Sequence, residues 1–155
     1  MDTFRIFLSS PGDVAEERLI ARRVIERLRS EFVGRVAIDP VFWEHEPLAA
    51  SASFQDQLPH PADAHAAICV LWSRLGTRLP GSLRKPDGSS YASGTEFEFE
   101  DALAGFRRNG RPTLLVYRKT APPLLDADDD AQSLDRLQQK QALDAFVRRW
   151  FHDET

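Results

Sequence analysis

The chain has 155 residues, of which 42% are hydrophobic and 28% are charged, and its formal net charge is −4. A chain of this length and composition buries a sizeable core without disulfides or metal ions. The negative charge argues against binding to duplex nucleic acid, which requires a basic surface. No apolar stretch approaches the ~20 residues that cross a bilayer, and the start Met1-Asp2-Thr3 has no signal-peptide features. We therefore expect one cytoplasmic domain over residues 1–155 that binds neither nucleic acid nor a membrane.

Strand-like and helix-like segments alternate along the chain. Apolar runs of strand length cover residues 4–9, 36–43, 66–72 and 113–119, whereas helical periodicity covers residues 13–32, 95–108 and 134–151. Long loops are expected at residues 44–63, with one helical turn near Phe54, and at residues 73–94 and 121–133. This alternation predicts an α/β fold with a parallel, flavodoxin-like sheet of four to five strands, covered by helices on both faces.

Local signals refine three of these elements. Ser10-Pro11-Gly12-Asp13 and Asp13-Val14-Ala15-Glu16 both fit a capping box at the start of the first helix, and Gly34 marks its end. Pro40 predicts that the second strand is an edge strand or contains a bulge. Cys69 is the only cysteine and lies in an apolar run, so we expect a buried, unreactive thiol.

Polar side chains gather where the predicted strands end. In an open parallel sheet, ligands bind beyond the carboxyl ends of the strands, which selects residues from three strand ends and from the start of the following helix: Ser9, Ser10, Trp43, Ser73, Arg74, Thr95, Glu96 and Glu98. Hydroxyls, an indole, a guanidinium and carboxylates suit a ligand with ribose and phosphate groups. Each side chain also has a structural interpretation, because serines cap helices, tryptophans pack at strand ends and Arg74 can pair with a nearby acid.

Other site types lack their sequence signals. The four histidines are His45, His60, His65 and His152, and they have neither cysteine partners nor metal-ligand spacing, so no metal site is expected. The chain contains neither a phosphate-binding glycine-rich motif nor a nucleophile elbow.

The stretch Ser93-Gly94-Thr95-Glu96-Phe97-Glu98-Phe99-Glu100-Asp101-Ala102-Leu103 holds four of the chain's acids. Ser93 to Glu96 and Thr95 to Glu98 each match a capping box, so either glutamate could serve only as a cap. The expected apolar stripe consists of Phe99, Ala102, Leu103 and Phe106, with Phe97 and Asp101 directed to solvent. Glu96 and Glu98 flank this stripe on opposite sides, and spacing alone does not choose between them.

Several motifs together resemble a TIR-like domain family. They are Arg5-Ile6-Phe7-Leu8-Ser9-Ser10-Pro11-Gly12-Asp13-Val14-Ala15-Glu16-Glu17-Arg18, Phe42-Trp43-Glu44, Leu71-Trp72-Ser73-Arg74-Leu75-Gly76-Thr77, the acidic stretch above, and Val116-Tyr117-Arg118-Lys119. The resemblance covers residues 4–151 and implies a TIR-like fold. Members are typically amino-terminal to STAND-type NTPase or repeat domains, so the resemblance implies an effector or signalling module of a larger protein, for example in antiviral defence. The chain departs from the family pattern at His65, where an acid is usual, and in its long 73–94 loop.

The resemblance extends to two groups of enzymes that break N-glycosidic bonds. Glu98-Phe99-Glu100-Asp101-Ala102-Leu103 is similar to the catalytic helix of TIR NAD hydrolases, and Gly94-Thr95-Glu96-Phe97-Glu98 is similar to nucleoside deoxyribosyltransferases. Both imply a catalytic Glu98. The similarity to TIR NAD hydrolases implies NAD as substrate rather than cofactor, and we expect Ser9, Ser10, Trp43, Ser73 and Arg74 to form the pocket. The alternatives are a non-catalytic self-association module and, further off, a nucleotide-sensing or nucleoside-processing domain.

Overall fold

A computed structural model describes residues 2–42, 60–79, 81, 83–123 and 130–151 of the chain, with side chains from residue 132 onward in the last range. Its strands are β1 (Thr3–Ser9), β2 (Ala37–Val41), β3 (Ala66–Leu71) and β4 (Thr113–Arg118). Its α-helices are α1 (Ala15–Glu31), α3 (Gly94–Asn109) and α4 (Asp130–Trp150), and two short 3₁₀ helices are η1 (Gly12–Val14) and η3 (Pro61–Asp63). Within the described part of the chain, no helix is both long enough and apolar enough to cross a membrane.

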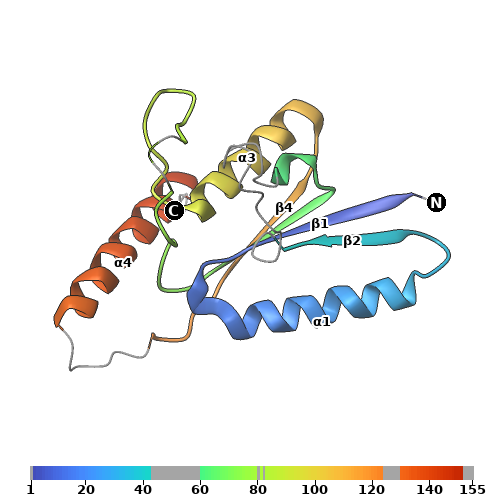
Figure 1. The fold of residues 1–155 in the computed structure, drawn as a ribbon, viewed down its shortest axis with the longest axis horizontal. Helices are drawn as coiled ribbons and strands as arrows, with labels where there is room; N and C mark the ends of the chain where they lie inside the picture. The colour runs from blue at the N-terminus through green and yellow to red at the C-terminus, as the bar shows by residue number, and fades with distance from the viewer. Residues whose placement is uncertain (1, 43–59, 80, 82, 124–129, 152–155) are drawn as a thin grey trace, which may run out of the picture.

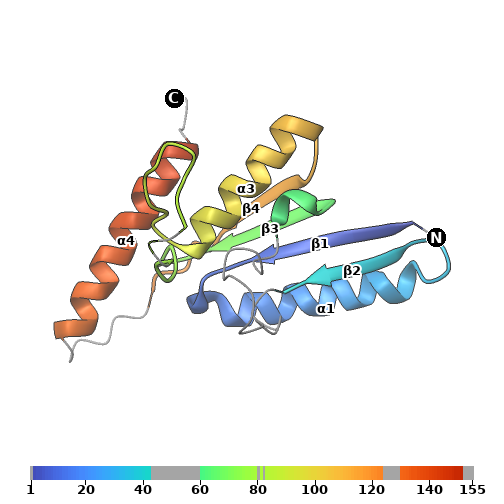
Figure 2. The ribbon, with the colours of Figure 1, turned by 45° about the horizontal axis from the view of Figure 1, so that its top comes forward.

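The four strands form one parallel sheet in the order β2-β1-β3-β4. Helix α1 covers one face, and α3 and α4 cover the other (Figures 1 and 2). This arrangement confirms the expected flavodoxin-like α/β fold. Strand β2 lies at the edge of the sheet, as Pro40 predicted, and Pro40 is the register partner of Ile6 in β1. Within the described sheet, no strand lies on the other side of β2, so a residue without a backbone N–H is tolerated there.

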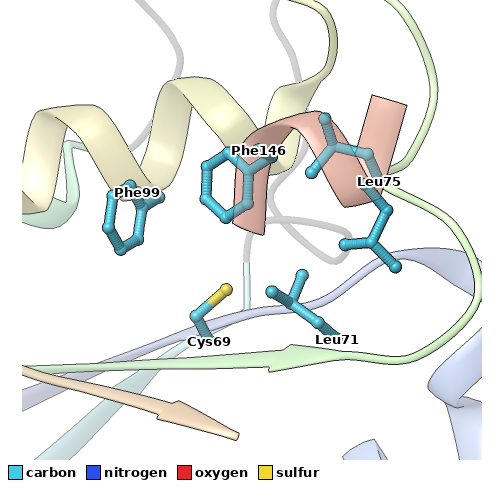
Figure 3. Close-up of a cluster of buried hydrophobic side chains, with 6 residues drawn as sticks. Cys69, Leu71, Leu75, Phe99 and Phe146 are labelled. Carbon is cyan, nitrogen blue, oxygen red and sulfur yellow. The ribbon is translucent and has the colours of Figure 1, made fainter. Parts of the chain in front are cut away.

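Side-chain alternation divides the core between the two faces. On the α3 face, Cys69 and Leu71 of β3 pack with Leu75, Phe99 of α3, and Leu143 and Phe146 of α4 (Figure 3). The rings of Phe99 and Phe146 meet edge to face at 5.0 Å between centroids. Replacing such a buried phenylalanine by alanine typically costs about 3–5 kcal/mol, so this cluster fixes α4 against α3 and the end of β3.

The opposite face holds a second cluster, in which Leu8, Val14 and Val70 are buried against α1. Because Leu8 and Val70 face α1, their neighbours Ser9 and Cys69 must face α3. The sheet therefore directs the last residue of β1 toward the helix that carries the acidic stretch.

Two local features differ from the prediction. Helix α4 begins at Asp130, four residues before the predicted start at Leu134, because an aspartate is favourable in a first helical turn. Neither η1 nor α1 has a side-chain cap, so the capping boxes proposed around Asp13 are wrong. The loop predicted at residues 44–63, with its helical turn near Phe54, lies mostly outside the described residues.

Candidate functional site

The turn between β1 and α1 is tied to the end of β3, which explains why the predicted caps do not form. Asp13 Oδ2 accepts hydrogen bonds from the Ser73 backbone N–H at 2.9 Å and from the Ser73 hydroxyl at 2.8 Å. The hydroxyl oxygen of Ser10 accepts a hydrogen bond from Arg18 Nε at 2.8 Å, and Arg18 also donates to the Pro11 carbonyl. Ser10 and Ser73, both predicted ligand contacts, therefore hold the rim of the sheet together.

Three segments converge at Gly76. Its φ is +114°, and a Cβ there would lie 3.1 Å from Thr95 Oγ1 and 3.7 Å from Pro11 Cβ and from Ser93 Cβ. A side chain would be strained in this conformation and crowded by these neighbours. The glycine thus allows the β1–α1 turn, the segment after β3 and the start of α3 to meet beyond the carboxyl ends of the two central strands.

The start of α3 is capped as the sequence predicted. The oxygen of Ser93 accepts a hydrogen bond from the Glu96 N–H at 3.1 Å, and the Ser93 hydroxyl donates to the Leu75 carbonyl at 3.0 Å. Glu96 Oε2 accepts the Ala92 N–H at 2.6 Å. In a regular capping box the glutamate accepts the N–H of the cap residue, here Ser93, so the bond is displaced by one residue. Glu96 is therefore a capping glutamate.

Lys85 occupies the other oxygen of Glu96. Its ammonium lies 2.8 Å from Glu96 Oε1 and 2.9 Å from Glu100 Oε1, and its side chain is only 6% exposed. Burial alone would lower the pKa of Lys85, but the hydrogen bonds to Glu96 and Glu100 outweigh burial and raise it. The cluster fastens the 73–94 loop to α3, so neither carboxylate is directed to the rim for chemistry.

Glu98 occupies a different face of α3. It shares a helical stripe with Thr95 and Ala102, and Ala102 packs on Phe7 and Ala67 of the sheet. One turn of helix separates Ala102 from Glu98, about 6 Å along the axis. Two residues of strand, about 6.6 Å, lead from the Phe7 and Ala67 pair toward the carboxyl ends of β1 and β3. Glu98 therefore lies over the last residues of these strands, and it is only 7% exposed.

The pair beneath Glu98 consists of Ser9 and Cys69, which are register partners in adjacent strands. Burial and, to a smaller extent, the negative charge of Glu98 raise the pKa of the Cys69 thiol to about 12, whereas a hydrogen bond with the Ser9 side chain lowers it. This confirms the prediction of a buried thiol. Ser9, which lies beside Cys69, is 4% exposed, and its hydroxyl makes no hydrogen bond to a nitrogen or oxygen of the described residues.

Unsatisfied polar atoms concentrate at this rim. Among the described residues, four buried side-chain nitrogen or oxygen atoms have no hydrogen-bond partner, namely Ser9 Oγ, Asp13 Oδ1, Arg74 Nε and Trp150 Nε1. Ser9 is the last residue of β1, whereas Asp13 and Arg74 follow β1 and β3. A buried polar group without a partner costs about 1–3 kcal/mol, so these atoms are candidates for contact with a polar ligand.

Arg74 turns toward α4. Its Nη2 lies 3.9 Å from Asp135 Oδ2, which is too long for a hydrogen bond. It lines a pocket of about 540 Å³ between the 74–92 segment and α4. Ser9, Asp13 and Glu98 do not line this pocket, and Arg74 therefore borders a second recess. Trp43 lies outside the described residues.

Three expectations for α3 are wrong. Phe97 is 7% exposed rather than directed to solvent, because Tyr91 from the long loop and His60 pack on its ring. Asp101 accepts the Ala62 N–H at 2.8 Å and is part-buried, whereas Phe106 is 49% exposed. The 73–94 loop and residues 60–62 therefore bury the side of α3 that periodicity assigned to solvent.

Sequence reasoning missed Lys85 and the role of Asp13. Both act through side chains 11 or more residues away, on Glu96 and Ser73 respectively, and no local spacing signals such pairs. Comparison with known proteins finds no matching family model, no matching curated protein and no matching solved structure. The site is therefore interpreted from its own geometry.

Proposed function

We propose that this chain is a TIR-like effector domain that hydrolyses NAD at the bond between nicotinamide and ribose, with Glu98 as its catalytic residue. The observation that carries the proposal is the position of Glu98. It is a buried carboxylate on the helical stripe that faces β1 and β3, over the register pair Ser9 and Cys69. Glu96 is held by Lys85 and by the Ala92 N–H on another face of α3, away from the sheet surface over which Glu98 lies.

The chemistry needs one carboxylate. The bond between C1′ of the ribose and the nicotinamide nitrogen breaks, and its electron pair leaves with nicotinamide as a neutral molecule. The ribose becomes an oxocarbenium-like cation, which a carboxylate fixed in a water-poor crevice stabilises. Water then adds its oxygen to C1′ and releases a proton, which yields ADP-ribose. No general acid is required, because the leaving group is uncharged.

The remaining rim residues have separate roles in this proposal. The hydroxyl of Ser9 and Oδ1 of Asp13 would contact ribose hydroxyls, which supply both donors and acceptors; both atoms are buried, and among the described residues neither has a nitrogen or oxygen partner. Ser10 and Ser73 fix the turn that presents them. Arg74, which the sequence assigned to the same set, turns toward α4 and borders the other recess, and Trp43 lies outside the described residues.

Nicotinamide release from NAD tests the proposal, with Glu98→Gln compared with Glu96→Gln at high protein concentration. Loss of one electrostatic stabiliser typically lowers the rate by about 10²–10³, and we expect this loss in Glu98→Gln alone. Equal rates in Glu98→Gln and the unchanged protein would contradict the proposal.

One observation favours a second candidate, a non-catalytic self-association module within a larger NTPase or repeat protein. Large apolar side chains are exposed on α1 and on the same face of β4, namely Leu19, Ile20, Val24, Leu115 and Tyr117. The 2.6 Å ion pair between Glu17 of α1 and Lys119, the residue after β4, brings the two elements together. Exposed apolar side chains that gather on one face are typical of protein interfaces. Sedimentation velocity of Val24→Glu against the unchanged chain tests it, because assembly that persists in the variant would remove this surface from consideration.

A further inference from the structure

The recess between the 74–92 segment and α4 lies apart from Glu98 and has the size and lining of a small-molecule site. Its volume of about 540 Å³ falls within the range of about 300–1,000 Å³ that is usual for ligand pockets. Leu75, Leu79 and Ala142 supply apolar lining, and Thr77, Ser90, Gln138 and Gln139 supply polar groups. Such a mixture suits a ligand with one apolar or planar part and one polar part.

Two arginines give this pocket its charge. Arg74 and Arg78 both line it, whereas Asp135 is the only acid among its described lining residues. Arg74 Nε is buried without a hydrogen-bond partner, and Asp135 lies too far from the guanidinium to hydrogen-bond. Arg78 makes no ion pair within the described part of the chain and is exposed. The lining thus carries an excess of one positive charge in a chain whose net charge is −4.

We propose that this pocket binds a phosphate monoester of about nucleotide size. Guanidinium groups hold phosphate oxygens through charge-assisted, often bidentate, hydrogen bonds, and an acceptor on the ligand would satisfy Arg74 Nε. The apolar lining would receive the organic part of the ligand. The site is separate from the proposed NAD crevice, because Ser9, Asp13 and Glu98 do not line it.

The position of the pocket links it to the rest of the molecule. Gln139 lines it and accepts a hydrogen bond from the Gly76 N–H at 3.1 Å. Gly76 in turn lies against Thr95 at the start of α3. A ligand in the pocket would contact the segment and the helix that together enclose the end of β3.

Isothermal titration calorimetry of the full chain with AMP, adenosine and inorganic phosphate tests the proposal. We expect saturable binding of AMP, at least tenfold weaker binding of adenosine, and at least a tenfold loss of AMP affinity in Arg78→Gln. Arg108→Gln is the matched control, because it removes an exposed arginine of α3 outside the pocket, and it should bind AMP as the unchanged protein does.

Backbone amide NMR locates the ligand. Shifts on AMP binding should centre on residues 74–79, 90–92 and 135–142. Absence of saturable binding of AMP and of phosphate, equal affinities in Arg78→Gln and Arg108→Gln, or shifts centred on residues 9–13 and 98 would each overturn the proposal. Glu98→Gln should bind AMP normally, so failure of this site and failure of NAD cleavage are distinguishable.

Discussion

Replacing Lys85 by methionine removes the one cation that holds two acids of the acidic stretch. The methionine keeps most of the apolar stem and removes the ammonium. Glu96 and Glu100 then lose hydrogen bonds of 2.8 and 2.9 Å while their side chains are only 9% and 15% exposed. Two nearly buried carboxylates are left close together, and like charges in such a position repel each other.

Breaking a buried ion pair by removing one partner typically lowers the free energy of unfolding by about 3–5 kcal/mol. Glu96 keeps the Ala92 N–H, and Arg149 lies 3.8 Å from Glu100, so both acids retain some compensation. We therefore expect the lower end, about 3 kcal/mol. For a domain of this size that loss corresponds to a decrease in Tm of about 6–12 °C.

Urea denaturation followed by tryptophan fluorescence measures the effect. Lys140→Met is the matched control, because it removes a lysine that pairs with Asp144 at 2.6 Å but is 63% exposed, and its cost should stay below about 0.5 kcal/mol. If Lys85→Met is as stable as Lys140→Met, the buried cluster does not fasten the 73–94 loop to α3.

Three further predictions concern pH, packing and the thiol. The partners of Lys85 raise its pKa. The difference in free energy of unfolding between the unchanged protein and Lys85→Met should therefore be constant up to about pH 10 and shrink at higher pH. A difference in free energy that grows with pH would contradict this. Gly105→Ala should lower the free energy of unfolding by about 1–2 kcal/mol in urea titration. Alanine normally favours helices, but its Cβ at this position would lie 2.9 Å from Ala62. Gly12→Ala is the control, because its Cβ meets nothing within 4 Å, and equal stabilities of the two variants would refute the clash. Cys69, whose pKa is raised to about 12 by burial, should resist iodoacetamide at pH 8 until urea unfolds the protein, and rapid alkylation of the folded chain would contradict that burial.

The fold could be predicted from the sequence because each strand and helix carries its own periodicity. The apolar run at residues 66–72 predicted a strand covered on both faces, and β3 is central with buried residues toward α1 and toward α3. Pro40 predicted the edge position of β2, since a proline lacks the N–H that an inner strand needs. These signals depend on neighbouring residues alone.

The site could be predicted only in part. The strand-end rule correctly brought Ser9, Ser10 and Ser73 to one rim, but it could not show that Asp13 and Arg18 already occupy two of these hydroxyls. Spacing could not show that Lys85 binds Glu96, because Lys85 comes from a loop whose path no periodicity determines. Phe97 was assigned to solvent for the same reason, because the same loop carries Tyr91 onto its ring.

We propose above that Glu98 stabilises a cationic ribose at the carboxyl ends of β1 and β3. Calorimetry of NAD binding, together with the rate of nicotinamide release, tests this for the unchanged protein and for Glu98→Gln. We expect Glu98→Gln to bind NAD within a fewfold of the unchanged protein but to release nicotinamide about 10²–10³ times more slowly. Release at the unchanged rate from Glu98→Gln, or none from either protein despite bound NAD, would contradict it.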